Sequence, residues 1–447
     1  MFKCHRKDNT SKAWRYLCGL IQGNRAMGET KKQVYDAEYY QLQHFITDSP
    51  WDSRPVMDKI AQEADRLIGS DSMNCLVLTP RSFDKKGFAS VGLRVMQNLS
   101  ANRYSKLSFP ELIKLLKNPR RLFAPSRAKL KHEPGLFRSQ MAIFGALCCN
   151  DQSALIDAEL HLPEFWILSD KCCARAGIQG SARKYGNYAE LVCRIVERQR
   201  QAGLRFDCVY VQKIIGDKGD ILELCRRLYD SGEKFMVRVP EYLMVFPENP
   251  QLGVKPAAGR GQMPNPHQPI SIYRFADLIP MEKWERVTVR KTAAAEQYDV
   301  CLRQVWVQDS DEKNARRYLL YMRREHRINR EYFLSNLPEE TTLAQLAQIE
   351  SSQFLADCAI NDGVAVGMGD YQVRSWRGWY HHMTMVMLAA LFKLKQQIIS
   401  GKNAAALSEQ DIRTMLDDFL LPPQSLLGAG KNSGTLKPSS LDRNRVA

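Results

Sequence analysis

The order of apolar segments between residues 75 and 239 constrains the fold of this 447-residue chain more than any other feature. Short runs of apolar and β-branched residues, which are typical of strands, alternate with segments whose apolar residues recur every three to four positions, as in helices. Three strands, a helix, a strand, a helix and a strand in this order predict an α/β sheet of mixed direction. The strands are expected at 75–78, 141–147, 154–160, 208–211 and 235–239, and the helices at 188–201 and 222–229.

The segments on either side predict further units. Apolar residues between positions 35 and 67 recur at helical spacing, and the Lys85-Lys86-Gly87 turn predicts a β-hairpin formed by residues 75–78 and 91–93. Alternating segments at 284–290, 298–307 and 316–323 predict an antiparallel β insertion. The expected units are a helical DNA-binding region at 1–70, the first part of the α/β domain at 71–245, a linker and β insertion at 246–330, the closing strand and helices at 331–421, and a disordered tail at 422–447.

Positive charge is concentrated in residues 103–138, where ten Lys and Arg side chains are accompanied by only Glu111 and Glu133. The whole chain carries a net charge of +15, which suits a partner made of phosphates, although such a charge also serves solubility. Leucine and phenylalanine are interleaved with the basic residues, so this basic stretch predicts an amphipathic helix with either a DNA-contacting or a merely solvated face. The expected DNA contacts are Lys114, Lys117, Arg120, Arg121, Arg127, Lys129 and Lys131.

Several classes of protein are disfavoured by the composition. No apolar run approaches the roughly 20 residues that span a bilayer, and the basic N-terminal residues lack the apolar stretch of a secretory signal. The twelve cysteines include no CxxC pair and no Cys/His group with zinc-ligand spacing, so buried thiols in a reducing compartment are expected and no metal site. We therefore expect a cytoplasmic protein that binds nucleic acid and no membrane.

A run of arginine, aromatic and histidine residues at 374–383 carries a second set of candidate contacts. Arg374 and Arg377 are expected to contact DNA phosphates, whereas Trp376 and Trp379 are expected to pack a helix onto the sheet. His381 and His382 are adjacent, and adjacent residues on a helix point about 100° apart. The pair is therefore not predicted to hold a metal.

Eight motifs resemble those of the DDE transposases of bacterial insertion sequences. They cover roughly residues 14 to 420, and the longest is also the most specific. The motifs are LQHF at 42–45, SPWD at 49–52, FDKKG at 83–87 with SVG at 90–92, ALID at 154–157 with LP at 162–163, YFLSNLP at 332–338, and GMGDYQVRSWRGWYHHM at 367–383.

This resemblance implies an RNase H-like mixed sheet flanked by helices and interrupted by the antiparallel β insertion, after an N-terminal helical domain. It also implies two magnesium ions held by three carboxylates at fixed strand and helix ends. None of the three family acids is present in this chain: Thr79 stands at the first position and Gln212 at the second, while Asp357 is the nearest candidate for the third, one methylene shorter. The lysine expected two turns later is also absent, with Val364 near its place.

The sequence thus predicts a transposase-like protein that binds double-stranded DNA, requires no cofactor and has lost catalysis, acting as a DNA binder or regulator. The alternative from the enzyme class is an active magnesium-dependent transposase or nuclease with a displaced set of acids. A decayed copy without function is disfavoured because the apolar pattern is intact. RNA as the partner and a homodimer as the assembly both stay open. The acids considered for a displaced set are Asp84, Asp217, Asp220 and Glu350.

Overall fold

The computed structural model describes most of the chain outside the basic stretch and the C-terminal residues. Lys114, Lys131 and the five predicted DNA contacts between them lie outside the described residues, as does most of the expected linker. The described ranges are 1–4, 7–23, 36–69, 73–85, 89–97, 136–178, 180–183, 186–212, 218–250, 268–290, 295–308, 315–325, 329–370, 374–401 and 407–421.

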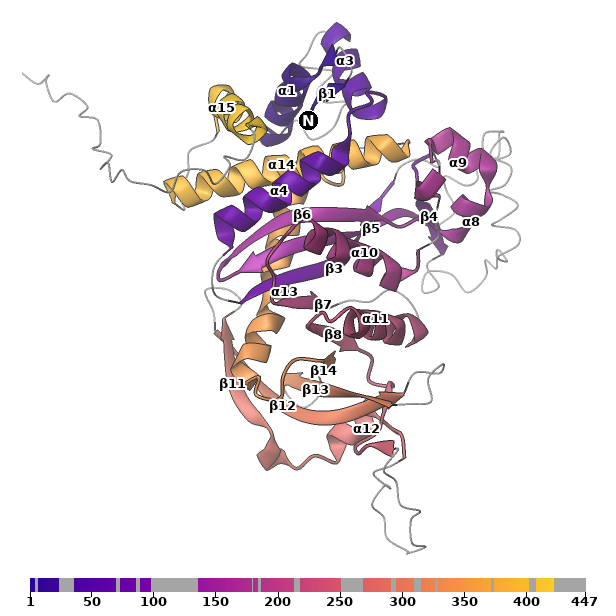
Figure 1. The fold of residues 1–447 in the computed structure, drawn as a ribbon, viewed down its shortest axis with the longest axis vertical. Coiled ribbons are helices and arrows are strands. Elements are labelled where there is room, and N and C mark those ends of the chain that lie inside the picture. The colour runs from indigo at the N-terminus through magenta and orange to yellow at the C-terminus, as the bar shows by residue number, and fades with distance from the viewer. Residues whose placement is uncertain are drawn as a thin grey trace, which may run out of the picture.

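A mixed sheet forms the centre of the molecule, as predicted, and its topology is consistent with an RNase H-like fold (Figure 1). Within the described residues it has ten strands in the order β11-β12-β13-β14-β8-β7-β3-β5, with β4 and β6 sharing the far edge of β5. β3, β7 and β8 are parallel, and the remaining pairs are antiparallel. The strands are β3 (Asn74–Asp84), β4 (Leu93–Gln97), β5 (Leu136–Cys149), β6 (Gln152–Leu160), β7 (Cys208–Val211), β8 (Phe235–Val239), β11 (Glu285–Arg290), β12 (Ala295–Gln308), β13 (Ala315–Glu325) and β14 (Asn329–Ser335).

The predicted hairpin between residues 75–78 and 91–93 is wrong. β3 and β4 each pair with β5 and not with one another: Phe83 and Leu93 both lie opposite Gln140. The reason is that a strand has two edges, and those of β3 are taken by β5 and by the parallel strand β7. The chain after β3 therefore joins the sheet on the other side of β5.

The β insertion extends the central sheet and forms no separate layer. β11 to β14 are antiparallel neighbours, and β14 pairs with β8 through Tyr332 and Val239. Figure 1 shows these strands continuing the sheet away from β6. Three short elements lie at this end: β9 (Met244–Val245), β10 (Ile270–Ser271) and α12 (Ile272–Asp277).

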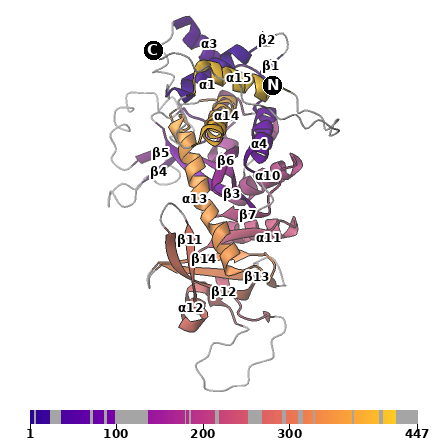
Figure 2. The same cartoon turned by 90° about the vertical axis from the view of Figure 1, so that its left-hand side faces the viewer.

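Helices cover both faces of the sheet. α10 (Tyr188–Gln201) and α11 (Lys218–Asp230) lie on one face, and the long helix α13 (Leu343–Ala365) crosses the other (Figure 2). α13 begins at a capping box, in which Thr342 and Gln345 each bond the backbone N–H of the other. Its buried side includes Leu346, Ile349 and Ile360. The burial of these apolar side chains against the sheet determines which side of α13 faces the strands.

A helical layer packs beside β6, at the opposite end of the molecule from the β insertion (Figure 1). At its centre α14 contacts α1, α3 and α4, and α15 packs on α1. Ser49, Pro50 and Trp51 lie between α3 and α4. No helix among the described residues is long and apolar enough to cross a bilayer. The helices are α1 (Thr10–Ile21), α3 (Asp36–Thr47), α4 (Ser53–Ile68), α14 (Trp376–Ser400) and α15 (Glu409–Leu420).

The aromatic and histidine residues of α14 tie this layer together. Trp379 is buried and Trp376 partly buried, so both pack, as expected. The ring nitrogens of His381 lie 2.9 Å and 2.8 Å from the carbonyl oxygens of Ile46 and Trp51. The paired histidines are thus part of the helix packing.

Candidate functional site

Two of the predicted site residues lie side by side where the parallel pairing of β3 with β7 ends. Leu78 of β3 is paired with Val211 of β7, and Thr79 and Gln212 are the next residues on the two strands. Parallel strands bring their carboxyl ends to the same edge of a sheet, and ligands of open α/β sheets bind at this edge. The first and second positions implied by the family resemblance are therefore neighbours in space.

Helix α13 brings a third uncharged side chain to this edge. Gln353 Nε2 donates a hydrogen bond to Thr79 Oγ1 at 3.3 Å, and both side chains are buried. Gln353 Oε1 is buried without a hydrogen-bond partner among the described residues. A threonine, a glutamine and a further glutamine thus stand together at the edge where the family resemblance implies three carboxylates.

Asp357, the acid nearest the third position in the sequence, lies one turn further along α13 and faces Arg81. Arg81 Nη2 donates to Asp357 Oδ1 at 2.7 Å, and both side chains are a little over a third exposed. Thr79 and Arg81 are two residues apart on a strand, about 6.6 Å, and Gln353 and Asp357 are four apart on a helix, about 6 Å. Because these two spacings are nearly equal, β3 and α13 make two contacts side by side, Thr79 with Gln353 and Arg81 with Asp357. The α13 side chain that lies against Thr79 is therefore Gln353.

The side chains at this edge do not fit a pair of magnesium ions. Mg²⁺ is bound in proteins through carboxylates with near-octahedral geometry, and neutral hydroxyl and amide oxygens do not offset its charge. The Arg81 guanidinium repels a cation, and its charge balances that of Asp357. Thr79, Gln212 and Gln353 therefore leave no net negative charge to hold two divalent ions.

Among the described residues, the acids of the displaced set, Asp84, Asp220 and Glu350, are not gathered into a replacement site. Glu350, one turn before Gln353, is buried and held by Arg323 Nη1 at 2.5 Å, with Tyr321 donating at 3.2 Å. Asp84 is exposed at the end of β3, and Asp220 lies in the first turn of α11. Asp217 lies outside the described residues. Among the described residues, no group of three or more His, Cys, Asp or Glu side chains is placed to hold a metal ion.

The two arginines predicted to contact DNA lie at the start of α14. Arg374 is exposed just before Ser375, whose side chain caps the helix by accepting from the Gly378 N–H. Arg377 is also exposed, and its Nη1 donates to the Asp48 carbonyl at 3.3 Å. Both guanidiniums are thus within reach of a ligand in solution.

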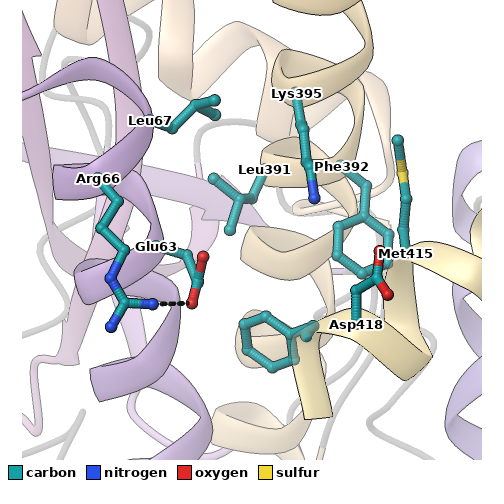
Figure 3. A pocket seen from close by; sticks show the side chains of 9 residues that line it. Glu63, Arg66, Leu67, Leu391, Phe392, Lys395, Met415 and Asp418 are labelled. Atoms are coloured by element: carbon teal, nitrogen blue, oxygen red, sulfur yellow. Dashed lines mark hydrogen bonds and ion pairs between the residues drawn. The ribbon is translucent and has the colours of Figure 1, made fainter. Parts of the chain in front are cut away.

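Two cavities are relevant to the choice of site. One of about 420 Å³ adjoins Gln212 and is lined by charged and tyrosine side chains, among them Arg238, Glu241 and Tyr242. Another of about 250 Å³ lies between α4, α14 and α15, with the Glu63–Arg66 ion pair at one side and the apolar Leu391 within (Figure 3). None of the residues lining this second cavity comes from β3, β7 or α13, so it is separate from the edge at Thr79.

One family model matches part of the chain. Residues 129–296 match the family described as DDE superfamily endonuclease. The matched region begins before β5, includes α10, β7, Gln212 and β11, and ends at the second residue of β12. No curated protein matches the chain. The matched region and the mixed sheet that carries it support a DDE-type, transposase-like protein.

Proposed function

We propose that this protein is a catalytically inactive relative of the DDE transposases that binds double-stranded DNA in the cytoplasm and acts as a regulator or competitor. The observation that carries the proposal is the trio of uncharged side chains at the sheet edge. Gln353 contacts Thr79, and Gln212 directly follows the neighbouring strand β7, at the edge where the family resemblance implies three acids. The family supports an interaction with DNA; the loss of cleavage and the regulatory role are our inference.

Metal binding at this edge depends on negative charge. In the two-metal mechanism one ion activates the attacking oxygen and the other stabilises the leaving oxygen, and both depend on carboxylates for their position. A threonine hydroxyl and two amides supply oxygen atoms but no negative charge. The cost of removing two divalent ions from water is therefore not offset by negative charge at this edge. Cleavage by the two-metal mechanism is not supported.

DNA binding is supported by different features. The chain carries a net charge of +15, and Arg374 and Arg377 are exposed at the start of α14. Each arginine or lysine that neutralises a phosphate releases counterions, which makes binding favourable and dependent on salt. Loss of three carboxylates also removes charges that would repel a phosphate in the absence of metal.

The test is a paired measurement of binding and cleavage. Fluorescence anisotropy would follow binding to duplexes from the DNA that flanks the gene and to scrambled duplexes, at two salt concentrations, and a nicking assay would follow with magnesium and with manganese. We expect binding that falls steeply with salt, a preference for the flanking DNA, and no nicking. Absence of binding at low salt contradicts the proposal.

The nicking assay also tests the alternative that the protein is an active transposase or nuclease with a displaced set of acids. Nicking that needs metal, persists in Thr79→Ala and is lost in Glu350→Gln would establish a displaced site that uses Glu350 and overturn the proposed loss of catalysis. A nick that appears equally in Glu350→Gln and in the parent protein would indicate a contaminating nuclease, so both variants belong in the experiment. We expect all three proteins to leave the duplex intact.

A further inference from the structure

Arg81 projects from the same face of β3 as Thr79 and lies directly beside the edge that has lost its acids. Alternate residues of a strand point to the same face, and α13 covers this face of β3. Arg81 is the cationic member of the two parallel contacts, Thr79 with Gln353 and Arg81 with Asp357. A positive side chain therefore stands beside the position at which the family resemblance implies metal ions.

The partner of Arg81 holds it only weakly. The Arg81 and Asp357 side chains are 39% and 38% exposed, and ion pairs exposed to this degree contribute little to stability because water screens them. One hydrogen bond, from Nη2 to Oδ1, joins the two groups. A competing anion can thus replace Asp357 without a large loss of folding free energy.

The guanidinium also has hydrogen-bonding capacity that Asp357 does not use. Arg81 Nε is buried and has no acceptor among the described residues. Buried donors without a partner are rare in proteins, and paired N–H groups of arginine match the oxygens of a phosphate. An anion that engages Nε together with Nη2 would satisfy this N–H as well.

From these contacts we propose that Arg81 holds a DNA backbone phosphate directly, without a metal ion, and that Asp357 is the intramolecular acceptor that this phosphate displaces. The inference rests on the proposed DNA binding and names the group that replaces the metal at the former cleavage edge. Thr79, as a hydroxyl donor, lies on the same face and does not repel the phosphate. In this proposal the former cleavage edge still binds a phosphate, but through the Arg81 guanidinium instead of metal ions.

The experiment is a double-mutant cycle on Arg81 and Asp357, with duplex binding measured by fluorescence anisotropy in EDTA. Arg81→Ala is expected to weaken binding about fivefold to tenfold near 0.1 M salt and to reduce the salt slope by about 1. Asp357→Asn is expected to tighten binding about twofold to threefold, because the phosphate no longer competes with a carboxylate. In the Arg81→Ala background, Asp357→Asn is expected to have no effect.

The matched control is a comparably exposed pair on α11, which covers the opposite face of the sheet. Arg226 and Asp230 are 37% and 48% exposed, and their side chains lie 3.6 Å apart. Arg226→Ala and Asp230→Asn should leave the affinity within twofold of the parent protein. Thermal unfolding of each variant checks that the fold is kept.

The outcomes separate the two proposals. If the parent protein binds DNA and Arg81→Ala binds equally well, the role of Arg81 is refuted and the proposed DNA binding stands. If Asp357→Asn tightens binding equally with and without Arg81, the effect is a general change of charge and the competition is refuted. If the parent protein does not bind at low salt, the proposed function itself fails.

Discussion

Asp157 is a fully buried carboxylate that side chains from α4 and α10 hold in place. Arg54 Nη1 donates to it at 2.8 Å, Arg198 Nε at 3.2 Å and Gln199 Nε2 at 2.7 Å. Burial would raise the pKa of Asp157, but the neighbouring Arg198 and Arg54 hold that pKa below its usual value. The carboxylate therefore stays charged and fastens both helices to β6.

At this residue we expect Asp157→Asn to lower the free energy of unfolding by about 3 to 5 kcal/mol, since two guanidiniums lose their buried counter-charge. Urea unfolding followed by circular dichroism measures the change. Asp58→Asn is the control, because Asp58 pairs with the same Arg54 but its side chain is 37% exposed. That variant should lose less than about 1 kcal/mol, and an equal loss in both variants would show that burial does not set the cost.

At the scale of elements, the register between β3 and α13 decides which side chains meet. The strand 208–211, the strand 235–239 and the helix 188–201 were predictable from the sequence to the residue, because their apolar periodicity is local. The contact of Gln353 with Thr79 was not, since it depends on how a helix far along the chain is rotated over a strand. The partner of β4 was missed for the same reason: it is a strand beyond the basic stretch.

This register makes a prediction about restoring the acids. The variant Thr79→Asp, Gln212→Asp, Gln353→Glu should bind Mn²⁺ or Mg²⁺, because it puts three carboxylates at one edge. At ten times the dissociation constant, the metal should add about 1.4 kcal/mol to its stability. Thermal unfolding with and without metal measures this.

The matched variant keeps Gln353 and carries Asp357→Glu with the same two strand substitutions. It should gain no stability from metal, because its third carboxylate faces Arg81 and not Thr79. Equal stabilisation of both triple variants would refute the placement of Gln353 at the third position.

For the molecule as a whole, buried histidines make stability depend on pH. Burial lowers the pKa of His382 to about 3 and that of His161 to about 4. The Gly367 carbonyl lies 3.1 Å from Nε2 of His382 and the Tyr16 hydroxyl 2.9 Å from Nδ1, which suits a neutral ring that donates from Nε2 and accepts at Nδ1. In the unfolded chain the pKa of both rings is near 6.5, so the unfolded state takes up protons more readily than the folded state. The free energy of unfolding therefore falls as the pH drops below about 6.5.

Between pH 7.5 and pH 5 each of these two histidines should therefore lower the stability by about 2 kcal/mol. Urea unfolding at the two pH values measures the loss. His382→Gln should remove its share of the pH dependence. A pH dependence that is the same in His382→Gln and the parent protein would contradict this assignment.

The continuity of the β insertion with the central sheet has a consequence for the order in which the protein forms during synthesis. The ribosome releases β8 well before β14, yet the edge of β8 is completed only when Tyr332 pairs with Val239. α13, which covers one face of the sheet, emerges later still. An open strand edge invites pairing with other chains, so the nascent protein must pass through a long interval in which its central sheet is half built.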